Sequence, residues 1–537
     1  MSFQGDSSGD DAPIGDGTQR AAPVDGELLD SHGTEPKAGT VRRRPWIVGG
    51  ASLAVLVAAG AGFAVGSMIG GGGAQPEDVL PSTVVMYADL DLDPAASQKL
   101  NLVRLLGRFP EVEDDYGPEP DVRELLVEQL TEDSDLASDD VLEWAGDRVG
   151  AGVAWDDEVD ALTPVVAIQV SDESAALDDL RDVVPADQVA AADGYVVVTG
   201  DASDFAEQAG GTGGGQPLLS SQSAAEIVAA GEQESLADAA GFSGAFDHLD
   251  EGLATVYIDG DAVAAAGDEV ATLLGLDNAQ VGDPFGELGR SGQMAAVLRA
   301  EPDAIEVAGW MSGESPYGSA PVTLVNELPQ STLFALEFTG GAESFAEQWD
   351  ALKEGVDNDM PAGSFERSLA QIEAQYGVRL PDDVVTLLGD DLVLAVDGDG
   401  LLTGVPGIGA RSLTDPAEGA DLARRLQRTL ATWSGGFGLT AEGTDDGMVI
   451  ASTPEFADVL TGGGGDLGTK AAFQEAVPDA DGASVVMWFD FSAVASLLAL
   501  AEPESAALID PLDSLGVSVT SSDSGSTMRA RLVFTDS

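Results

Sequence analysis

The sequence predicts an α+β protein with one N-terminal transmembrane helix followed by two homologous α+β units that contain largely antiparallel sheets. Three observations lead to this prediction. Residues 46–69 form a run of 24 residues without a charged side chain. After residue 78, short β-branched segments alternate with segments of helical periodicity. The same order of segments then begins again at Leu328.

The chain opens with a polar tail, residues 1–41, which is acidic and rich in Gly, Asp, Ser and Pro. Such a segment cannot bury enough apolar surface to offset the entropy of ordering. We therefore predict a disordered tail. The orientation of the anchor that follows places this tail in the cytoplasm.

Residues 42–73 are predicted to be the transmembrane anchor. As a helix, the uncharged run reaches roughly 36 Å, which is enough to cross a hydrocarbon core of about 30 Å. Three arginines, residues 42–44, precede the run and no basic group follows it directly. The positive-inside rule then places the bulk of the chain outside the cell membrane, as a single-pass protein. A cleaved signal peptide is the alternative, because Gly72 and Ala74 are small enough for a cleavage site.

Small residues recur along the predicted anchor. Gly62, Gly66 and Gly70 follow one another at intervals of four. This spacing lets two transmembrane helices approach closely, and it predicts a homodimer through this ridge. The alternative is that the composition of the chain simply favours Gly and Ala.

Charge and cysteine content exclude several classes of protein. The chain carries 95 acidic and 23 basic residues, a formal net charge of −72. A nucleic-acid partner is excluded, because binding a polyanion needs a basic surface. The chain contains no cysteine, so disulfides and thiolate catalysis are impossible. Envelope proteins and glycans are the partner classes that this composition still allows.

The first extracytoplasmic unit is predicted to span residues 78–320. Its first strand follows Leu80-Pro81 and ends before Pro94, and residues 98–109 then show helical spacing of leucines. Some later strands have no helix between them, which predicts hairpins and hence antiparallel neighbours, and we expect helices to cover one face of the sheets. The remaining predicted segments are helices at 121–130, 139–145, 174–184, 202–209 and 221–249, and strands at 149–155, 164–170, 195–199, 253–259, 292–300 and 304–312.

The second unit, residues 326–537, repeats landmarks of the first in the same order. Differences in the spacing between landmarks fit insertions and deletions in loops. Asp-Asp before an apolar segment is expected to cap a helix and to place negative charge in its first turn. The matching landmarks are Leu80-Pro81 with Leu328-Pro329, Asp139-Asp140 with Asp382-Asp383, Asp193-Gly194 with Asp446-Gly447, and Phe242 and Asp259 with Phe473 and Asp490.

Five aspartates are the candidate functional residues. Asp89, Asp91 and Asp93 alternate along the first predicted strand, so their side chains should share one face. Asp259 and Asp490 end corresponding strands, and capping the following helix is the alternative role for both. No metal, cofactor or catalytic residue is assigned. A Ser-His-Asp triad would have to use the single extracytoplasmic histidine, residue 248, and no nucleophile elbow accompanies it.

Several short motifs resemble a bacterial family described as domain of unknown function 3352. They are Leu80-Pro81, Asp89-Leu90-Asp91-Leu92-Asp93-Pro94, Gln98-Lys99-Leu100 and Arg108-Phe109-Pro110, placed soon after the predicted spanning helix. The resemblance covers most of residues 75–537. It implies a membrane-anchored extracytoplasmic protein and assigns no activity or site residue.

The anchor, the duplication and the lack of a catalytic motif together predict a non-catalytic cell-envelope protein that binds or scaffolds. The sequence leaves open whether the chain is an enzyme, and the lack of a catalytic motif argues against it. One alternative is a carboxylate-dependent hydrolase acting on envelope glycans. Another is a carrier for an apolar ligand, which the apolar spacing of residues 98–109 favours.

Overall fold

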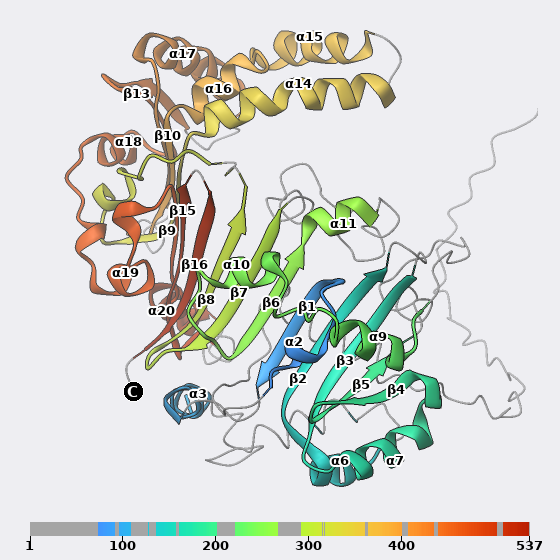
Figure 1. The fold of residues 1–537 in the computed structure, drawn as a ribbon. Coiled ribbons are helices and arrows are strands. Elements are labelled where there is room, and N and C mark those ends of the chain that lie inside the picture. Colours follow the sequence, from blue (N-terminus) through green and yellow to red (C-terminus); the bar gives the residue numbers. More distant parts are fainter. Residues whose placement is uncertain are drawn as a thin grey trace, which may run out of the picture. The chain divides into compact units, whose positions relative to one another are not determined.

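Short apolar and β-branched segments pair into one antiparallel sheet of 16 strands, which dominates the part of the chain described by the computed structural model (Figure 1). Every neighbouring pair of strands is antiparallel. The prediction of an α+β protein with a large antiparallel sheet is therefore confirmed. The described residues are 74–91, 96–108, 127, 131, 136–156, 161–200, 221–266, 292–313, 315, 317–359, 363–399, 406–433, 439–501, 509–522 and 524–535.

All described residues belong to one compact unit within residues 45–537. The predicted tail, the predicted anchor with Gly62, Gly66 and Gly70, and the predicted helix at 202–209 lie outside them. Of the predicted helix at 121–130, only Val127 is described. Within the described ranges, none of the helices combines the length and the apolar character that crossing a membrane requires.

The strands of the first half follow the predicted pattern closely. The hairpin predicted from residues 149–155 and 164–170 forms as the β2–β3 pair. A short edge strand, β4, was not predicted. The strands are β1 (Val84–Asp91), β2 (Ala145–Asp156), β3 (Ala161–Val170), β4 (Val189–Ala192), β5 (Tyr195–Thr199), β6 (Ala254–Asp259), β7 (Gln293–Ala300) and β8 (Ala304–Ser312).

The strands of the second half complete the sheet. They are β9 (Thr332–Thr339), β10 (Asp391–Asp397), β11 (Gly407–Leu413), β12 (Thr440–Gly443), β13 (Gly447–Ala451), β14 (Val485–Asp490), β15 (Leu512–Ser522) and β16 (Gly525–Phe534).

One succession of strands occurs twice across the sheet. The first half reads β4-β5-β3-β2-β1-β6-β7-β8, and the second reads β12-β13-β11-β10-β9-β14-β15-β16. The two halves meet where β8 pairs with β16, from Ser312 opposite Gly525 to Ala304 opposite Val533. The two halves are therefore one hydrogen-bonded body in the described chain.

Helices connect and cover the strands. In the first half they are α2 (Pro76–Val79), α3 (Ala96–Leu106), α6 (Ser138–Trp144), α7 (Glu173–Val183), α9 (Ala224–Gly231), α10 (Ala240–Phe246) and α11 (Gly260–Ala266), with the 3₁₀ turn η1 (Ala186–Gln188). In the second half they are α14 (Gly341–Asp359), α15 (Ser364–Tyr376), α16 (Asp382–Leu388), α17 (Pro416–Trp433), α18 (Pro454–Thr461), α19 (Ala471–Ala476) and α20 (Phe491–Ala501), with η2 (Val325–Glu327), η3 (Leu467–Thr469) and η4 (Ala480–Gly482).

Both faces of the sheet are covered near its two ends, which corrects the expectation of helices on one face alone. In β5, Tyr195 and Val197 pack in one buried cluster with residues of α9 and α10. Val196 and Val198 pack in another cluster with residues of α6 and α7. Successive residues of a strand point to opposite faces, so the two clusters lie on opposite sides of the sheet.

A buried glutamate marks the junction of the two halves. Glu306 on β8 is 1 % exposed. Arg531 of β16 places Nη1 3.3 Å from Oε2 of Glu306, and Arg529 places Nε 3.6 Å from Oε1. Arg299 of β7 also pairs with Glu306. Guanidinium groups from both halves thus compensate one carboxylate, which adds ionic contacts to the β8–β16 hydrogen bonds.

Candidate functional site

Asp89 and Asp91 lie two residues apart on β1, so they share a face of the sheet as predicted. They have different partners. The hydroxyl of Thr255 on β6 donates to Oδ2 of Asp89. Nε of Arg148 lies 3.0 Å from Oδ2 of Asp91, and these two side chains are only 5 % and 10 % exposed. Asp93 lies outside the described residues.

The surroundings of Asp89 favour its protonated form. Glu77 of α2 lies close to it, and the hydroxyl of Tyr87 donates to Oε2 of Glu77 at 2.8 Å. Burial and the negative charge of Glu77 raise the pKa of Asp89 to about 8, although the hydrogen bond from Thr255 opposes the shift. At neutral pH Asp89 is mainly a neutral carboxylic acid held in hydrogen bonds.

Glu337 on β9 is a second buried acid that was not among the predicted site residues. Its side chain accepts hydrogen bonds from the backbone amides of Thr323 at 2.6 Å, Leu324 at 2.8 Å and Val325. Burial and the negative charge of Asp391 raise the pKa of Glu337 to about 8. A signal was present in the sequence: Asp89 and Glu337 each follow the leucine of a Leu-Pro pair by nine residues.

Asp259 and Asp490 cap the helices that follow their strands. Oδ1 of Asp259 accepts from the amide of Ala262 at 3.0 Å, and Oδ1 of Asp490 accepts from the amide of Ala493 at 2.9 Å. Asp490 also binds Nζ of Lys470 at 2.5 Å. Burial opposes ionisation of Asp490, but the hydrogen bonds from Lys470 and Ala493 outweigh it and lower its pKa. Asp259 and Asp490 thus have the helix-capping role that the sequence offered as the alternative to a functional role.

Asp259→Ala is expected to lower the free energy of unfolding by about 1 kcal/mol, the usual effect of removing a cap. Asp490→Ala should lower it by about 3 kcal/mol, because Lys470 also loses its buried partner. Urea unfolding of the purified chain measures both. Exposed Asp458 of α18 provides the matched control. Equal effects of all three alanine variants would show that neither contact stabilises the fold.

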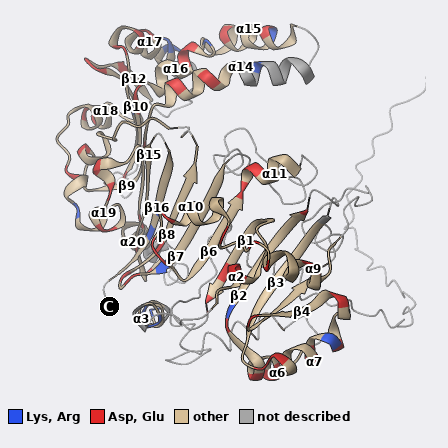
Figure 2. Cartoon of the chain, in the orientation of Figure 1, with Lys and Arg blue, Asp and Glu red and all other residues tan. Residues whose placement is uncertain are grey.

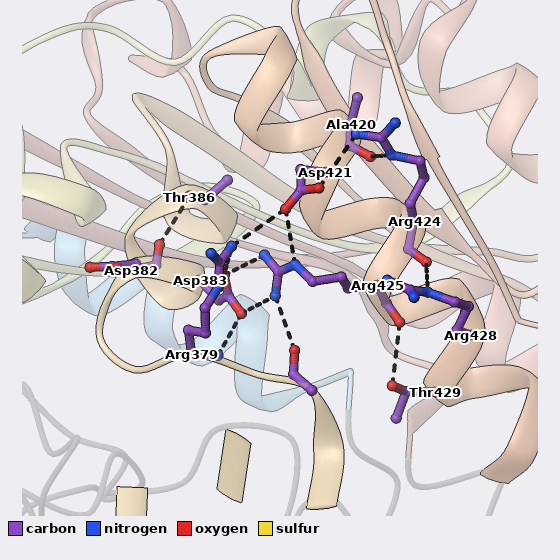
Figure 3. Close-up of polar contacts among 11 residues, drawn as sticks. Arg379, Asp382, Asp383, Thr386, Ala420, Asp421, Arg424, Arg425, Arg428 and Thr429 are labelled. Carbon is purple, nitrogen blue, oxygen red and sulfur yellow. Dashed lines mark hydrogen bonds and ion pairs between the residues drawn. The ribbon is translucent and has the colours of Figure 1, made fainter. Parts of the chain in front are cut away.

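A cluster of arginines on α17 and before α16 surrounds buried Asp383 (Figure 3). Arg425 places Nη1 2.5 Å and Nη2 2.6 Å from the two oxygens of Asp383. Nε of Arg425 also lies 3.1 Å from Oδ2 of Asp421, and Arg379 contacts both carboxylates at 3.4 Å. The arginines that meet Asp383 are thus compensated, so this cluster joins helices and presents no open anion site.

An uncharged strip, which we call the apolar strip, lies on one face of the central sheet. Its residues form two cross-strand rows in which each member is directly opposite the next. The first row is Leu394, Leu336, Met487, Val517, Ala530 and Val307. The second row is Phe338, Val485, Val519, Met528, Gly309 and Ala296.

Exposure alternates along these strands, and the partly exposed positions are apolar. In β9, Ala335 and Glu337 are buried, whereas Leu336 and Phe338 between and beside them are partly exposed. The same alternation occurs in β15 and, from Val486 onward, in β14, whereas Val485 and Gly309 of the strip are buried. In Figure 2 the central strands are mostly tan, and the acidic residues gather on helices and near strand ends. In the described part of the chain, one face of these strands is therefore buried, and the opposite, apolar face is partly exposed.

Helices limit the open width of the strip at its β7–β8 end. Three residues pack against α3: Leu298, which lies opposite Val307, and Ile305 and Leu532, which belong to the row next to Val307 and Ala530. On the other side, Met294 packs with residues of α11. The two rows of the strip lie between these helices. A continuous apolar run such as 485–489 predicts a strand buried on both faces, and only the folded chain reveals the open one.

The described residues hold no group of three or more His, Asp or Glu side chains that could bind a metal. His248 is exposed and stacks on Trp310, with ring centroids 4.6 Å apart. Comparison of the chain with protein-family models, curated proteins and solved structures returns no match.

Proposed function

We propose that the chain is a membrane-anchored, extracytoplasmic binding protein of the cell envelope, without catalytic activity and built from two homologous units. Residues 42–73 hold it in the membrane, and the described body lies outside. The family resemblance of the motifs between Leu80 and Pro110 supports the same location.

The proposed duplication is supported by contacts as well as by strand order. The two halves follow one succession of eight strands each. Asp259 and Asp490, which differ by 231 positions, cap helices through the equivalent amides of Ala262 and Ala493. Independent folding of two unrelated units would not be expected to reproduce both features.

The apolar strip is the observation that carries the proposed binding function. Contiguous apolar surfaces of several hundred Å² are uncommon on soluble proteins and mark sites of interaction. With about 4.8 Å between strands and about 7 Å between alternate residues, the two rows cover roughly 24 by 7 Å before side-chain width is added. A surface of this size in so acidic a chain is expected to have a partner.

A photoreactive phenylalanine analogue in place of Val517, at the centre of the strip, is expected to form adducts in living cells. The same analogue in place of Val459, which is 41 % exposed on α18, is the control. Mass spectrometry of the two purified products compares them. Adducts of equal yield at both positions, or none at position 517, would contradict binding through the strip.

The proposed location has its own test. Protease added to intact, wall-stripped cells is expected to digest the body after residue 74 and to leave the N-terminal tail protected. Antibodies against the two ends of the chain follow the fragments. Digestion of the tail with survival of the body would reverse the orientation, and protection of both would place the chain inside the cell.

A further inference from the structure

We propose that the apolar strip binds the acyl chains of a neutral membrane lipid. The inference rests on the proposed binding function and names the ligand of the same surface. Four features of the described residues lead to it: the hydrogen bonding of the strip, its charge, its shape and the composition of its side chains.

The strip offers a ligand almost no hydrogen-bonding group. Its side chains are those of Leu, Met, Val, Phe and Ala, together with one Gly. The backbone groups of its strands are engaged in the antiparallel ladders. A polar group of a glycan or of an extended peptide would lose its water here and find no partner, which costs free energy. A hydrocarbon chain brings no such group.

Charge selects among hydrocarbon ligands. Neither row of the strip contains a charged residue, whereas the whole chain has a formal net charge of −72. An anionic headgroup next to the strip would be repelled by the field of the protein. A neutral headgroup meets no such barrier, so a diacyl lipid without net charge fits better than a fatty-acid anion or an acidic phospholipid.

The shape of the strip suits a chain-like ligand. The strip crosses six strands in each row, a length of roughly 24 Å. An acyl chain reaches roughly 15 Å, half of a 30 Å hydrocarbon core. The width of two rows, roughly 14 Å with side chains, accommodates two such chains side by side. The flanking helices α3 and α11 would hinder a broad, flat protein surface from reaching the rows between them.

Two methionines, Met487 and Met528, lie in the strip. Their unbranched, polarisable side chains adapt to ligands of variable conformation, as disordered acyl chains are. Neighbouring Phe338 and Leu336 supply larger apolar contacts on β9. Binding should therefore depend on hydrophobic contact and tolerate different chain lengths.

The test uses the full chain reconstituted into phosphatidylcholine vesicles that contain a trace of diacylglycerol with a diazirine in one acyl chain. After illumination, mass spectrometry locates the label. We expect label on peptides of β9, β14, β15, β16 and β8. Val517→Glu and Met487→Glu should each reduce this label about tenfold or more, because an acyl chain would bury a carboxylate. Val459→Glu should leave it unchanged.

Three further measurements keep the result decisive. Thermal unfolding shows whether the glutamate variants still fold. Ala530→Trp stays apolar but raises a bulky ring above the strip, and it should shift the label to neighbouring strands. A diazirine-labelled phosphatidate should label the strip several-fold less than the neutral lipid. Equal labelling by the two lipids would overturn the headgroup argument.

The outcomes separate the two proposals. Label that is unaffected by Val517→Glu in a folded variant would overturn lipid binding. If the analogue at position 517 captures an apolar helix of another protein and the lipid leaves the strip unlabelled, the binding function stands and this inference fails. Absence of any adduct at the strip in both experiments would overturn both.

Discussion

Replacing Asp383 with alanine is expected to lower the free energy of unfolding by about 3 to 5 kcal/mol. The side chain of Asp383 is 3 % exposed, and that of its partner Arg425 is 16 % exposed. Removal of the carboxylate leaves this guanidinium without its two shortest hydrogen bonds, at 2.5 and 2.6 Å. The amide of Arg379, which donates to Asp383 at 2.6 Å, also loses its acceptor.

Asp421 provides the matched comparison, because it contacts the same Arg425 from a side chain that is 51 % exposed. Water and salt screen such a pair, so Asp421→Ala should hardly change stability. Urea unfolding of both variants at neutral pH gives the difference. If Asp383→Ala is as mild as Asp421→Ala, the buried pair does not hold α16 against α17 (Figure 3).

Glu337→Gln is expected to remove part of the dependence of stability on pH. In the wild type, the pKa of Glu337 is raised from an ordinary 4.5 to about 8 in the folded chain. Between these values the unfolded chain has released the proton while the folded chain keeps it. The free energy of unfolding therefore falls as pH rises, by about 1.4 kcal/mol per pH unit for this one group, and levels off above pH 8.

Glutamine stays neutral at every pH, so the variant should lack this slope. In the wild type, Oε2 of Glu337 accepts a hydrogen bond from the backbone amide of Val325. The amide nitrogen of glutamine cannot accept this bond, so we expect the free energy of unfolding to fall by about 1 to 2 kcal/mol near pH 4.5. Unfolding free energies measured from pH 4.5 to 8.5 should then approach each other, cross within about two pH units, and separate with the variant as the more stable chain at higher pH. Exposed Glu343 on α14 serves as the control. Parallel curves for the wild type and Glu337→Gln would contradict a proton held at Glu337.

Much of the fold could be predicted because its signals are local. The segment 304–312 has the composition of a strand and follows its neighbour after a short turn, and it forms β8 paired with β7. The predicted helix at 174–184 begins with a capping aspartate, Asp172, whose Oδ1 accepts from the amides of Ser174 and Ala175. Strand composition and helix caps of this kind depend on about a dozen consecutive residues, so the sequence alone reveals them.

Contacts that are distant in the sequence could not be predicted. Asp383 was expected to cap a helix, but the N-cap of α16 is Pro381, and Asp383 pairs with Arg425, 42 positions away. The union of the two halves through β8 and β16 joins segments more than 200 positions apart. Periodicity gives the faces of a strand, but it does not tell which face a helix will cover.

The two outermost strands of the sheet have a consequence for the behaviour of the protein at high concentration. β4 and β12 both contain only four residues. An unpaired strand edge is a template on which another chain can add a strand, and very short edge strands are one way in which natural proteins limit this. Both edges of this wide sheet are therefore formed by very short strands, which disfavours edge-to-edge association of one molecule with the next.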